Sequence, residues 1–413
     1  MTTYRARLLT PTGPESVRWL DDAVVRVEDG RIEEVAAYDG RAVDEDLRPG
    51  VLMPGFVDAH VHHPQTRIVG SATGPLLTWL ERTVFPEERR FADPAHAAAV
   101  AETFATRIAA AGTTFAFVYG SVHAEATDTL LRTLARRGLR AVVGPVWMDA
   151  HCPEALCRPG DEALRDVEAL ARRWHGHDGR LEIAVIPRFA LCCTPTTLER
   201  AGALARDLGL WVSTHLSEHV EEVETARRRF GAPDYLSVYE RAGLVHDRAV
   251  FAHCVHLSPS EWDRLAEAGA VVAHCPDSND FLGSGGMPPS EPMSRGIPIT
   301  IGTDVGAGRS FRVPRILSSA YDNGLRHGVA LDPRRLLWWG TRGAARALGR
   351  DRIGALEPGF DADMVLMDLP GTVRGAHGVS SAVIFDHDAP GPARTWVRGR
   401  TVFDRSDARR SIP

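Results

Sequence analysis

Histidine and carboxylate side chains recur in this 413-residue chain at spacings that suit a metal ion. His60 and His62 are two residues apart, so on a strand both imidazoles point to the same side. His215, His253 and Asp304 follow at the ends of later apolar runs. Imidazole nitrogens with one carboxylate oxygen suit Zn²⁺ or Fe²⁺ and leave a position for water. The HxH pair alone could equally be two structural histidines, and the further residues are what favour a metal site.

Glu218 lies three residues beyond His215, in HLSE, where it can face the same ion without being a ligand. A metal lowers the pKa of a bound water toward about 7, and a neighbouring carboxylate can then carry a proton to a substrate nitrogen. Alone, Glu218 would be interpreted as an exposed carboxylate at a helix start. Beside His215 it becomes a candidate acid or base.

Short apolar runs alternate with helical stretches through most of the chain, as expected for a (β/α)8 barrel. Eight such runs occur, at 52–62, 112–120, 141–149, 181–189, 210–218, 249–256, 270–278 and 297–304. Catalytic groups of such barrels stand at the carboxyl ends of the strands. The polar residues of this chain fall at those ends: His60, His62, Arg188, His215, Glu218, His253 and Asp304.

The two ends of the chain are both β-like, with turn residues between short strands. We therefore expect an α/β protein with three segments. Residues 1–51 and 351–413 form a small β-sandwich domain together, and residues 52–350 form the barrel.

The chain contains no lysine, so all 48 Lys and Arg residues are arginine. This excludes a Schiff-base lysine, a P-loop lysine and a carboxylated lysine between two metals. A net charge of -6 gives no basic field for nucleic acid. We expect no signal peptide or membrane span, and the six cysteines suit reduced thiols in the cytoplasm.

Several motifs, in order, resemble the amidohydrolase superfamily. They are VLMPGFVDAHVH (51–62), HLSE (215–218), HCPDSN (274–279) and GTD (302–304). Binuclear members usually bridge their metals with a carboxylated lysine, so the resemblance implies the mononuclear deaminase branch. It assigns one metal, Zn²⁺ rather than Fe²⁺, to His60, His62, His215 and Asp304. It assigns His253 to the attacking water, and Glu218 and Asp304 to proton transfer.

Further motifs resemble the guanine deaminase family through nearly the whole barrel. They are HHPQT (62–66), TWLERTVFPEERRF (78–91), PRF (187–189) and FAHCVHLSPSEW (251–262). The resemblance implies a homodimeric hydrolase of purine metabolism that converts guanine to xanthine and ammonia. It places Gln65, Arg188 and Phe189 at the purine, with His215 beside it, and Trp79 is a candidate for stacking on the ring.

Some positions depart from the family pattern, in loops after the strand ends. Asp280 follows HCPDSN, Arg309 follows GAG, and Ala150 and His151 follow VWMD. Asp280 and Arg309 could pair with each other or recognise a substituent that guanine lacks. Two alternatives therefore stay open: the same chemistry on a guanine analogue, pterin or other amino-heterocycle, and a barrel that has lost catalysis and serves as a binding protein.

Overall fold

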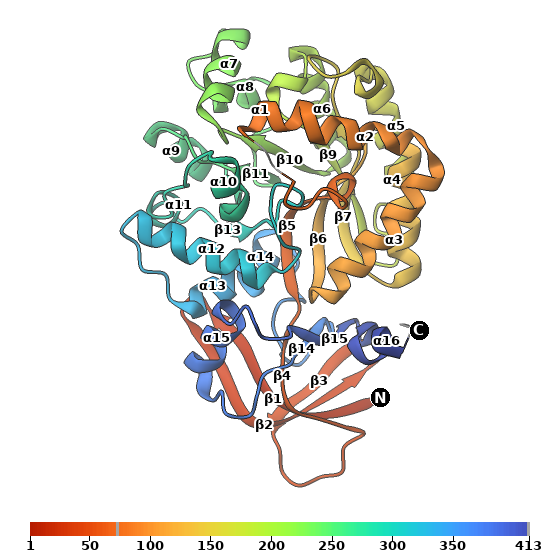
Figure 1. The fold of residues 1–413 in the computed structure, drawn as a ribbon, viewed down its shortest axis with the longest axis vertical. Helices are drawn as coiled ribbons and strands as arrows, with labels where there is room; N and C mark the ends of the chain where they lie inside the picture. The colour runs from red at the N-terminus through yellow and green to blue at the C-terminus, as the bar shows by residue number, and fades with distance from the viewer. Residues whose placement is uncertain (72–73, 411–413) are drawn as a thin grey trace.

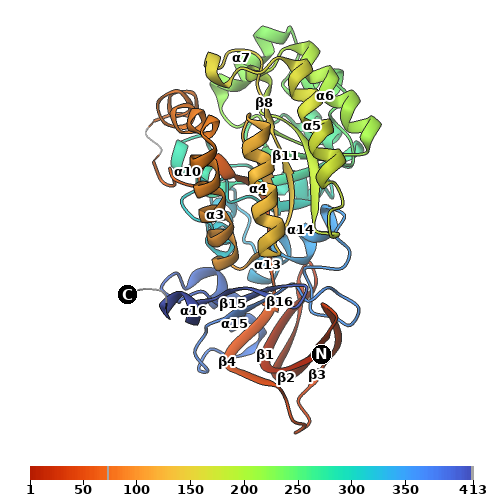
Figure 2. The same ribbon diagram turned by 90° about the vertical axis from the view of Figure 1, so that its right-hand side faces the viewer.

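Two sheets organise the chain in the computed structural model, which describes residues 1–71 and 74–410. The larger sheet is a barrel of parallel strands surrounded by helices, and the smaller one lies below it and contains both ends of the chain (Figure 1). Figure 2 shows the same division from the side. The predicted α/β barrel with a small β domain is confirmed.

The barrel strands follow one another in chain order around the sheet. They are β5 (Phe56–His62), β6 (Thr113–Tyr119), β7 (Arg140–Gly144), β9 (Leu181–Pro187), β10 (Trp211–Leu216), β11 (Ala249–His253), β12 (Val271–His274) and β13 (Ile299–Ile301). The segment after β13 closes the barrel onto β5. The Asp304 amide donates to the His60 carbonyl at 2.8 Å, and the His62 amide donates to the Val305 carbonyl at 3.1 Å.

Each of the eight predicted runs overlaps a barrel strand, and every one of these strands except β5 ends before its run does. Pro145 interrupts the third run, because proline has no amide hydrogen for the ladder. The two-residue strand β8 (Val146–Trp147) follows it and pairs with β9. The eighth strand ends at Ile301, and Asp304 stands in the loop beyond it.

The helices of the barrel lie outside its strands (Figures 1 and 2). They are α3 (Pro94–Ala110), α4 (Ala124–Arg137), α5 (Gly160–Trp174), α6 (Pro195–Leu208), α7 (Val220–Phe230), α8 (Leu236–Arg241), α9 (Pro259–Glu267), α10 (Pro276–Leu282), α11 (Ser290–Ser294), α12 (Val313–Arg326), α13 (Pro333–Gly340) and α14 (Arg342–Ala347). Gly138 and Gly209 end α4 and α6 in the left-handed conformation, as C-terminal glycines commonly do. Among the described residues, no helix combines the length and apolarity needed to span a membrane.

A separate helical segment lies across the end of the barrel away from the small sheet (Figure 1). It consists of α1 (Leu76–Trp79), the π-helical turn η2 (Leu80–Val84), α2 (Phe85–Glu88) and the 3-10 turn η3 (Arg89–Ala92). We call residues 76–92 the cover segment. π-Helical turns are rare and are often found at functional sites.

The small domain is one seven-stranded sheet with the order β16-β15-β14-β4-β1-β2-β3. Its strands are β1 (Thr2–Gly13), β2 (Ser16–Glu28), β3 (Arg31–Ala37), β4 (Glu45–Pro54), β14 (Met364–Met367), β15 (Pro392–Val397) and β16 (Arg400–Asp404), with helices α15 (Gly375–Phe385) and α16 (Arg405–Arg410) beside them. Tyr4 on β1 and Trp396 on β15 are three strand spacings apart, about 14 Å in a flat sheet. Their ring centroids are 5.7 Å apart. The sheet is therefore strongly curved between β1 and β15, and its strands form one continuous sheet in place of two separate layers.

A buried ion-pair cluster joins the barrel to the small domain. Arg140, at the start of β7, reaches Asp361 at 2.9 Å and Asp363 at 3.0 Å, and all three side chains are at most 8% exposed. Asp363 directly precedes β14 of the small sheet. The cluster fixes the position of one sheet relative to the other.

Candidate active site

Four of the predicted residues converge at the carboxyl ends of the barrel strands. The ligand atoms of His60, His62, His215 and Asp304 all lie within 4.8 Å of one another. His60 Nε2 and His62 Nε2 are each 3.2 Å from Asp304 Oδ1. His62 Nε2 is also 3.1 Å from His60 Nε2 and 3.3 Å from His215 Nε2. Ligands about 2.0 Å from a tetrahedral zinc are about 3.3 Å apart, so these four side chains fit one ion.

The chemistry of these donors also fits a metal. Burial lowers the pKa of His60 to about 3, and it lowers the pKa of His62 and His215 as well, so the three rings are neutral. Burial opposes ionisation of Asp304, but hydrogen bonds from His60 and His62 outweigh it and hold the Asp304 pKa well below its usual range. His215 Nδ1 donates to the Arg188 carbonyl at 2.6 Å, which leaves the lone pair on Nε2.

Glu218 and His253 form a second group on the other side of Asp304. His253 Nε2 lies 3.5 Å from Glu218 Oε2 and 4.0 Å from Asp304 Oδ2. Burial raises the pKa of Glu218 well above its ordinary value, and the charges of Asp304 and Glu222 add to this. Glu218 Oε1 is buried and has no hydrogen-bond partner in the described structure. Glu218 is therefore a buried acid whose surroundings favour its protonated form.

Strained backbone holds this group in place. Ser217, His253 and Asp304 have φ values of 52°, 72° and 46°, in the left-handed region that side chains other than glycine rarely adopt. Such conformations cost about 1–3 kcal/mol each and cluster at active sites. These three residues turn the chain sharply at or just beyond the ends of β10, β11 and β13.

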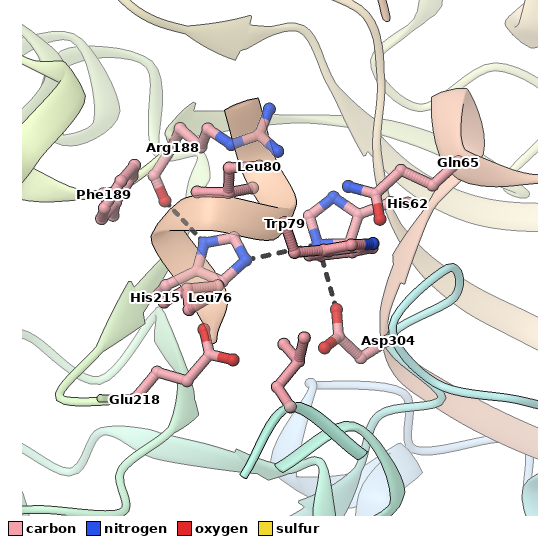
Figure 3. Close-up of a pocket in the computed structure, with 11 residues that line it drawn as sticks. His62, Gln65, Leu76, Trp79, Leu80, Arg188, Phe189, His215, Glu218 and Asp304 are labelled. Atoms are coloured by element: carbon pink, nitrogen blue, oxygen red, sulfur yellow. Dashed lines mark hydrogen bonds and ion pairs between the residues drawn. The ribbon is translucent and has the colours of Figure 1, made fainter. Parts of the chain in front are cut away.

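One pocket is lined by His62, His215, Glu218 and Asp304 together (Figure 3). Its walls are formed by His62, Gln65, Leu76, Trp79, Leu80, Arg188, Phe189, His215, Glu218, Leu282 and Asp304. All five residues predicted to contact a substrate are thus present in the wall: Gln65, Trp79, Arg188, Phe189 and His215. In Figure 3, Glu218 and Asp304 stand at one end of the pocket and Arg188 and Gln65 toward the other.

Other residues of this region were not anticipated from the sequence. Leu76, Leu80 and Leu282 line the pocket, Asn279 contacts His253, and Glu88 contacts Arg188. The motifs around Glu88 and Asn279 were recognisable, but nothing in them indicated which side chain would reach the site.

The positions that depart from the family pattern lie outside the pocket wall. Asp280 does not pair with Arg309, which corrects one of the two interpretations of these residues. Asp280 is bound by Arg326 at 2.7 Å, and Arg309 by Asp277 at 2.6 Å. Ala150 and His151 are likewise absent from the wall.

A (β/α)8 barrel with candidate metal ligands at the carboxyl ends of its strands defines a class of protein, and comparison with known proteins identifies the family. Residues 51–402 match the amidohydrolase family. The chain belongs to the amidohydrolase family, whose members are metal-dependent hydrolases.

Within that family, the similarity is to guanine deaminases. A probable guanine deaminase of Deinococcus radiodurans is 38% identical, over 98% of this chain and 99% of its own. The guanine deaminase of Escherichia coli (strain K12) is 33% identical, over 95% and 93%. A solved structure of E. coli guanine deaminase superposes with a TM-score of 0.93 at 32% identity, covering 98% of this chain and all of that one. The resemblance found in the sequence is confirmed.

Proposed function

We propose that this protein is a metal-dependent guanine deaminase that converts guanine and water to xanthine and ammonia. One observation carries the proposal: a cluster of candidate metal ligands and the buried Glu218 share a pocket with Arg188 and Gln65, which can bind the opposite edge of a purine. The guanine deaminases among its relatives support the choice of substrate.

The metal would be held by His60, His62, His215 and Asp304, whose nitrogen and oxygen donors suit zinc or iron. Zinc is favoured because a solved adenosine deaminase from Xanthomonas campestris, 30% identical to this chain, has bound zinc. When bound, it would supply an activated water for attack on the carbon bearing the amino group. Each buried neutral ring has one unprotonated nitrogen that could bind the ion.

The protein's own acids and bases would move the protons. Glu218 would give its proton to the ring nitrogen beside the reacting carbon, because its raised pKa keeps it protonated. His253 Nε2 would orient the water. The ionised Asp304 would take one proton from the water and deliver it to the departing amine, so the carbon–nitrogen bond breaks and ammonia leaves. The proton left on the new oxygen would return to Glu218, so that the carbonyl of xanthine forms and Glu218 is protonated again.

The other end of the pocket would bind the ring. Arg188 can only donate, so it suits the O6 acceptor of guanine, and Gln65 can donate and accept along one edge. Phe189 and Trp79 offer aromatic faces to the purine.

An ammonia-release assay on the zinc-loaded protein tests the proposal. Guanine, 8-oxoguanine, isoguanine, pterins and aminotriazines form the panel, and the metal content of the same sample is measured. Guanine should give the highest kcat/KM. Release from none of them would refute deamination, and a metal content near zero after gentle purification would favour a binding protein.

The main reason for proposing a different ring substrate was the pair of positions Asp280 and Arg309, and this reason is weakened. Asp280 and Arg309, which suggested it, are engaged by other side chains and do not line the pocket. The assay panel decides this alternative directly.

The oligomeric state and the location belong to the same proposal. The family resemblance supports a homodimer, which sedimentation or size-exclusion chromatography with light scattering would measure. The six cysteines are free, which suits the reducing cytoplasm. We expect neither nucleic acid nor membrane to be a partner.

A further inference from the structure

The cover segment contributes to the pocket in two ways. Leu76, Trp79 and Leu80 form part of the pocket wall. Glu88, the last residue of α2, is only 5% exposed but is not part of the wall. Its carboxylate lies behind the residues that would contact a ligand.

Glu88 holds two wall residues that come from different strands. Its Oε2 accepts a hydrogen bond from Arg188 Nη1 at 2.6 Å, and its Oε1 accepts one from Gln65 Nε2 at 3.4 Å. Arg188 directly follows β9, and Gln65 ends the short turn η1 (His63–Gln65) after β5. A single carboxylate from the cover segment thus joins the two side chains at the ring-binding end.

The contacts of Gln65 fix which end of its amide faces which neighbour. Gln65 Oε1 accepts from the Gly306 amide at 2.9 Å, while Nε2 donates to Glu88. A flipped amide would place its oxygen against the Glu88 carboxylate and its NH₂ against an amide hydrogen. The network therefore permits one orientation of Gln65.

The contacts of Arg188 also leave a defined set of donors free. Within the described chain, the hydrogen bonds from its guanidinium all leave from Nη1. The Phe85 ring, also on α2, lies 5.5 Å from Cζ and supports the planar group. Nε and Nη2 remain for a ligand that brings a hydrogen-bond acceptor.

We propose that Glu88 is a positioning residue that makes the pocket specific for a purine with an acceptor at position 6. It does so by holding Arg188 and Gln65 in the orientations described, without contacting the substrate. This inference rests on the proposed function, because it concerns how that same pocket selects its substrate.

Simple charge balance is the competing role for Glu88. A buried arginine needs a counter-ion, because burial lowers the pKa of its guanidinium. The carboxylate of Glu88 outweighs this effect and raises the pKa of Arg188. A counter-ion need only be nearby, whereas a positioning residue must have the right length and two acceptor oxygens. The two roles therefore predict different results for a shortened carboxylate.

The test compares guanine with 2-aminopurine, which has the same amino group but no oxygen at position 6. In Glu88→Gln, kcat/KM for guanine should fall at least about tenfold, mainly through KM, and kcat/KM for 2-aminopurine by less than about threefold. Glu88→Asp keeps the charge but shortens the side chain, so it should lose discrimination too. A general loss of folding would lower both rates together.

Glu87→Gln is the matched control. Glu87 is the neighbouring residue of the same helix, is 7% exposed, and pairs with His96 and Arg90 instead of the pocket residues. Its variant should keep the discrimination of the wild type. Two results would overturn the positioning role in favour of charge balance. One is a Glu88→Asp variant that keeps the wild-type ratio of kcat/KM between guanine and 2-aminopurine. The other is a Glu88→Gln variant that loses kcat/KM equally on both substrates with an unchanged melting temperature.

Failure of the proposed function would look different. A wild-type protein that releases ammonia from neither purine would refute the deaminase proposal itself. Crystal structures of the wild type and Glu88→Gln would then decide the positioning role, which requires Arg188 or Gln65 to reorient in the variant. Unchanged side chains would overturn it.

Discussion

His253 Nδ1 lies 2.8 Å from Asn279 Oδ1, so a side chain of α10 sets the tautomer of the histidine that ends β11. The ring donates through Nδ1 and keeps the lone pair of Nε2 for the pocket. His253 Nε2 has no hydrogen-bond partner in the described structure, and it faces Glu218 and Asp304. The hydrogen bond from Nδ1 therefore leaves Nε2 as an oriented acceptor directed toward Glu218 and Asp304.

Replacing Asn279 with alanine should release this ring. Removal of such a supporting hydrogen bond typically costs about 10- to 100-fold in activity, so we expect kcat on guanine to fall within that range with KM little changed. Metal content should stay at the wild-type level, because His253 is outside the four-residue ligand group. Steady-state kinetics and elemental analysis measure both, and a wild-type kcat would show that the ring needs no such support.

Glu218→Gln should abolish most activity while leaving the metal in place. General acid–base groups contribute about 10²- to 10⁴-fold, and the amide cannot donate the proton that Glu218 carries. Single-turnover rates on guanine test this, with Glu221→Gln, an exposed change on α7, as control. Loss of metal from Glu218→Gln would instead make Glu218 a ligand.

Removal of the metal should stop the reaction, and zinc should restore it. The ligand histidines have lowered pKa values, so they are unprotonated at neutral pH and become protonated only in more acidic solution. Proton competition for the site is therefore small, and zinc affinity should change little between about pH 6 and 8. Competition titrations against a chelator measure it. A steep rise in affinity across that range would show that the ligands are protonated in the apo protein.

The barrel and the cluster of candidate ligands could be predicted because their signals are local. The spacing of His60 and His62 places both on one side of a strand, and each further ligand follows an apolar run. Parallel strands then bring these ends to one face. Periodicity and strand polarity were enough to indicate a metal site.

The supporting contacts could not be predicted, because they join residues that no local pattern relates. Glu88 meets a guanidinium 100 positions later in the chain, and Asn279 meets a histidine 26 positions earlier. Asp280 and Arg309 show the reverse error: they suggested a function by departing from a pattern, yet each is paired outside the pocket. Side-chain partners depend on packing, which a single sequence does not display.

Changes at those two positions should leave substrate preference intact. Asp280→Asn breaks only a partly exposed pair, so it should cost less than about 1 kcal/mol of unfolding free energy. Arg309→Ala removes the cation from the buried Asp277, which keeps hydrogen bonds from the backbone amide of residue 309 and from Ser319 Oγ. Because Arg309 is 41% exposed, we expect a cost of about 1–2 kcal/mol. The relative rates on guanine and pterins should match the wild type within about twofold. A larger change would restore these residues as specificity determinants.

The Arg140 cluster should contribute measurably to the stability of the contact between the two domains. Arg140→Ala would leave Asp361 and Asp363 buried without their cation, and breaking such pairs costs about 3–5 kcal/mol. Arg140→Lys keeps the charge but cannot present the same fork to two carboxylates, so it should be intermediate. Arg5→Ala is the control: its pair with Asp22 is partly exposed and should cost less than about 1 kcal/mol. Urea unfolding measures all three, and equal midpoints for Arg140→Ala and Arg5→Ala would show that the cluster adds little.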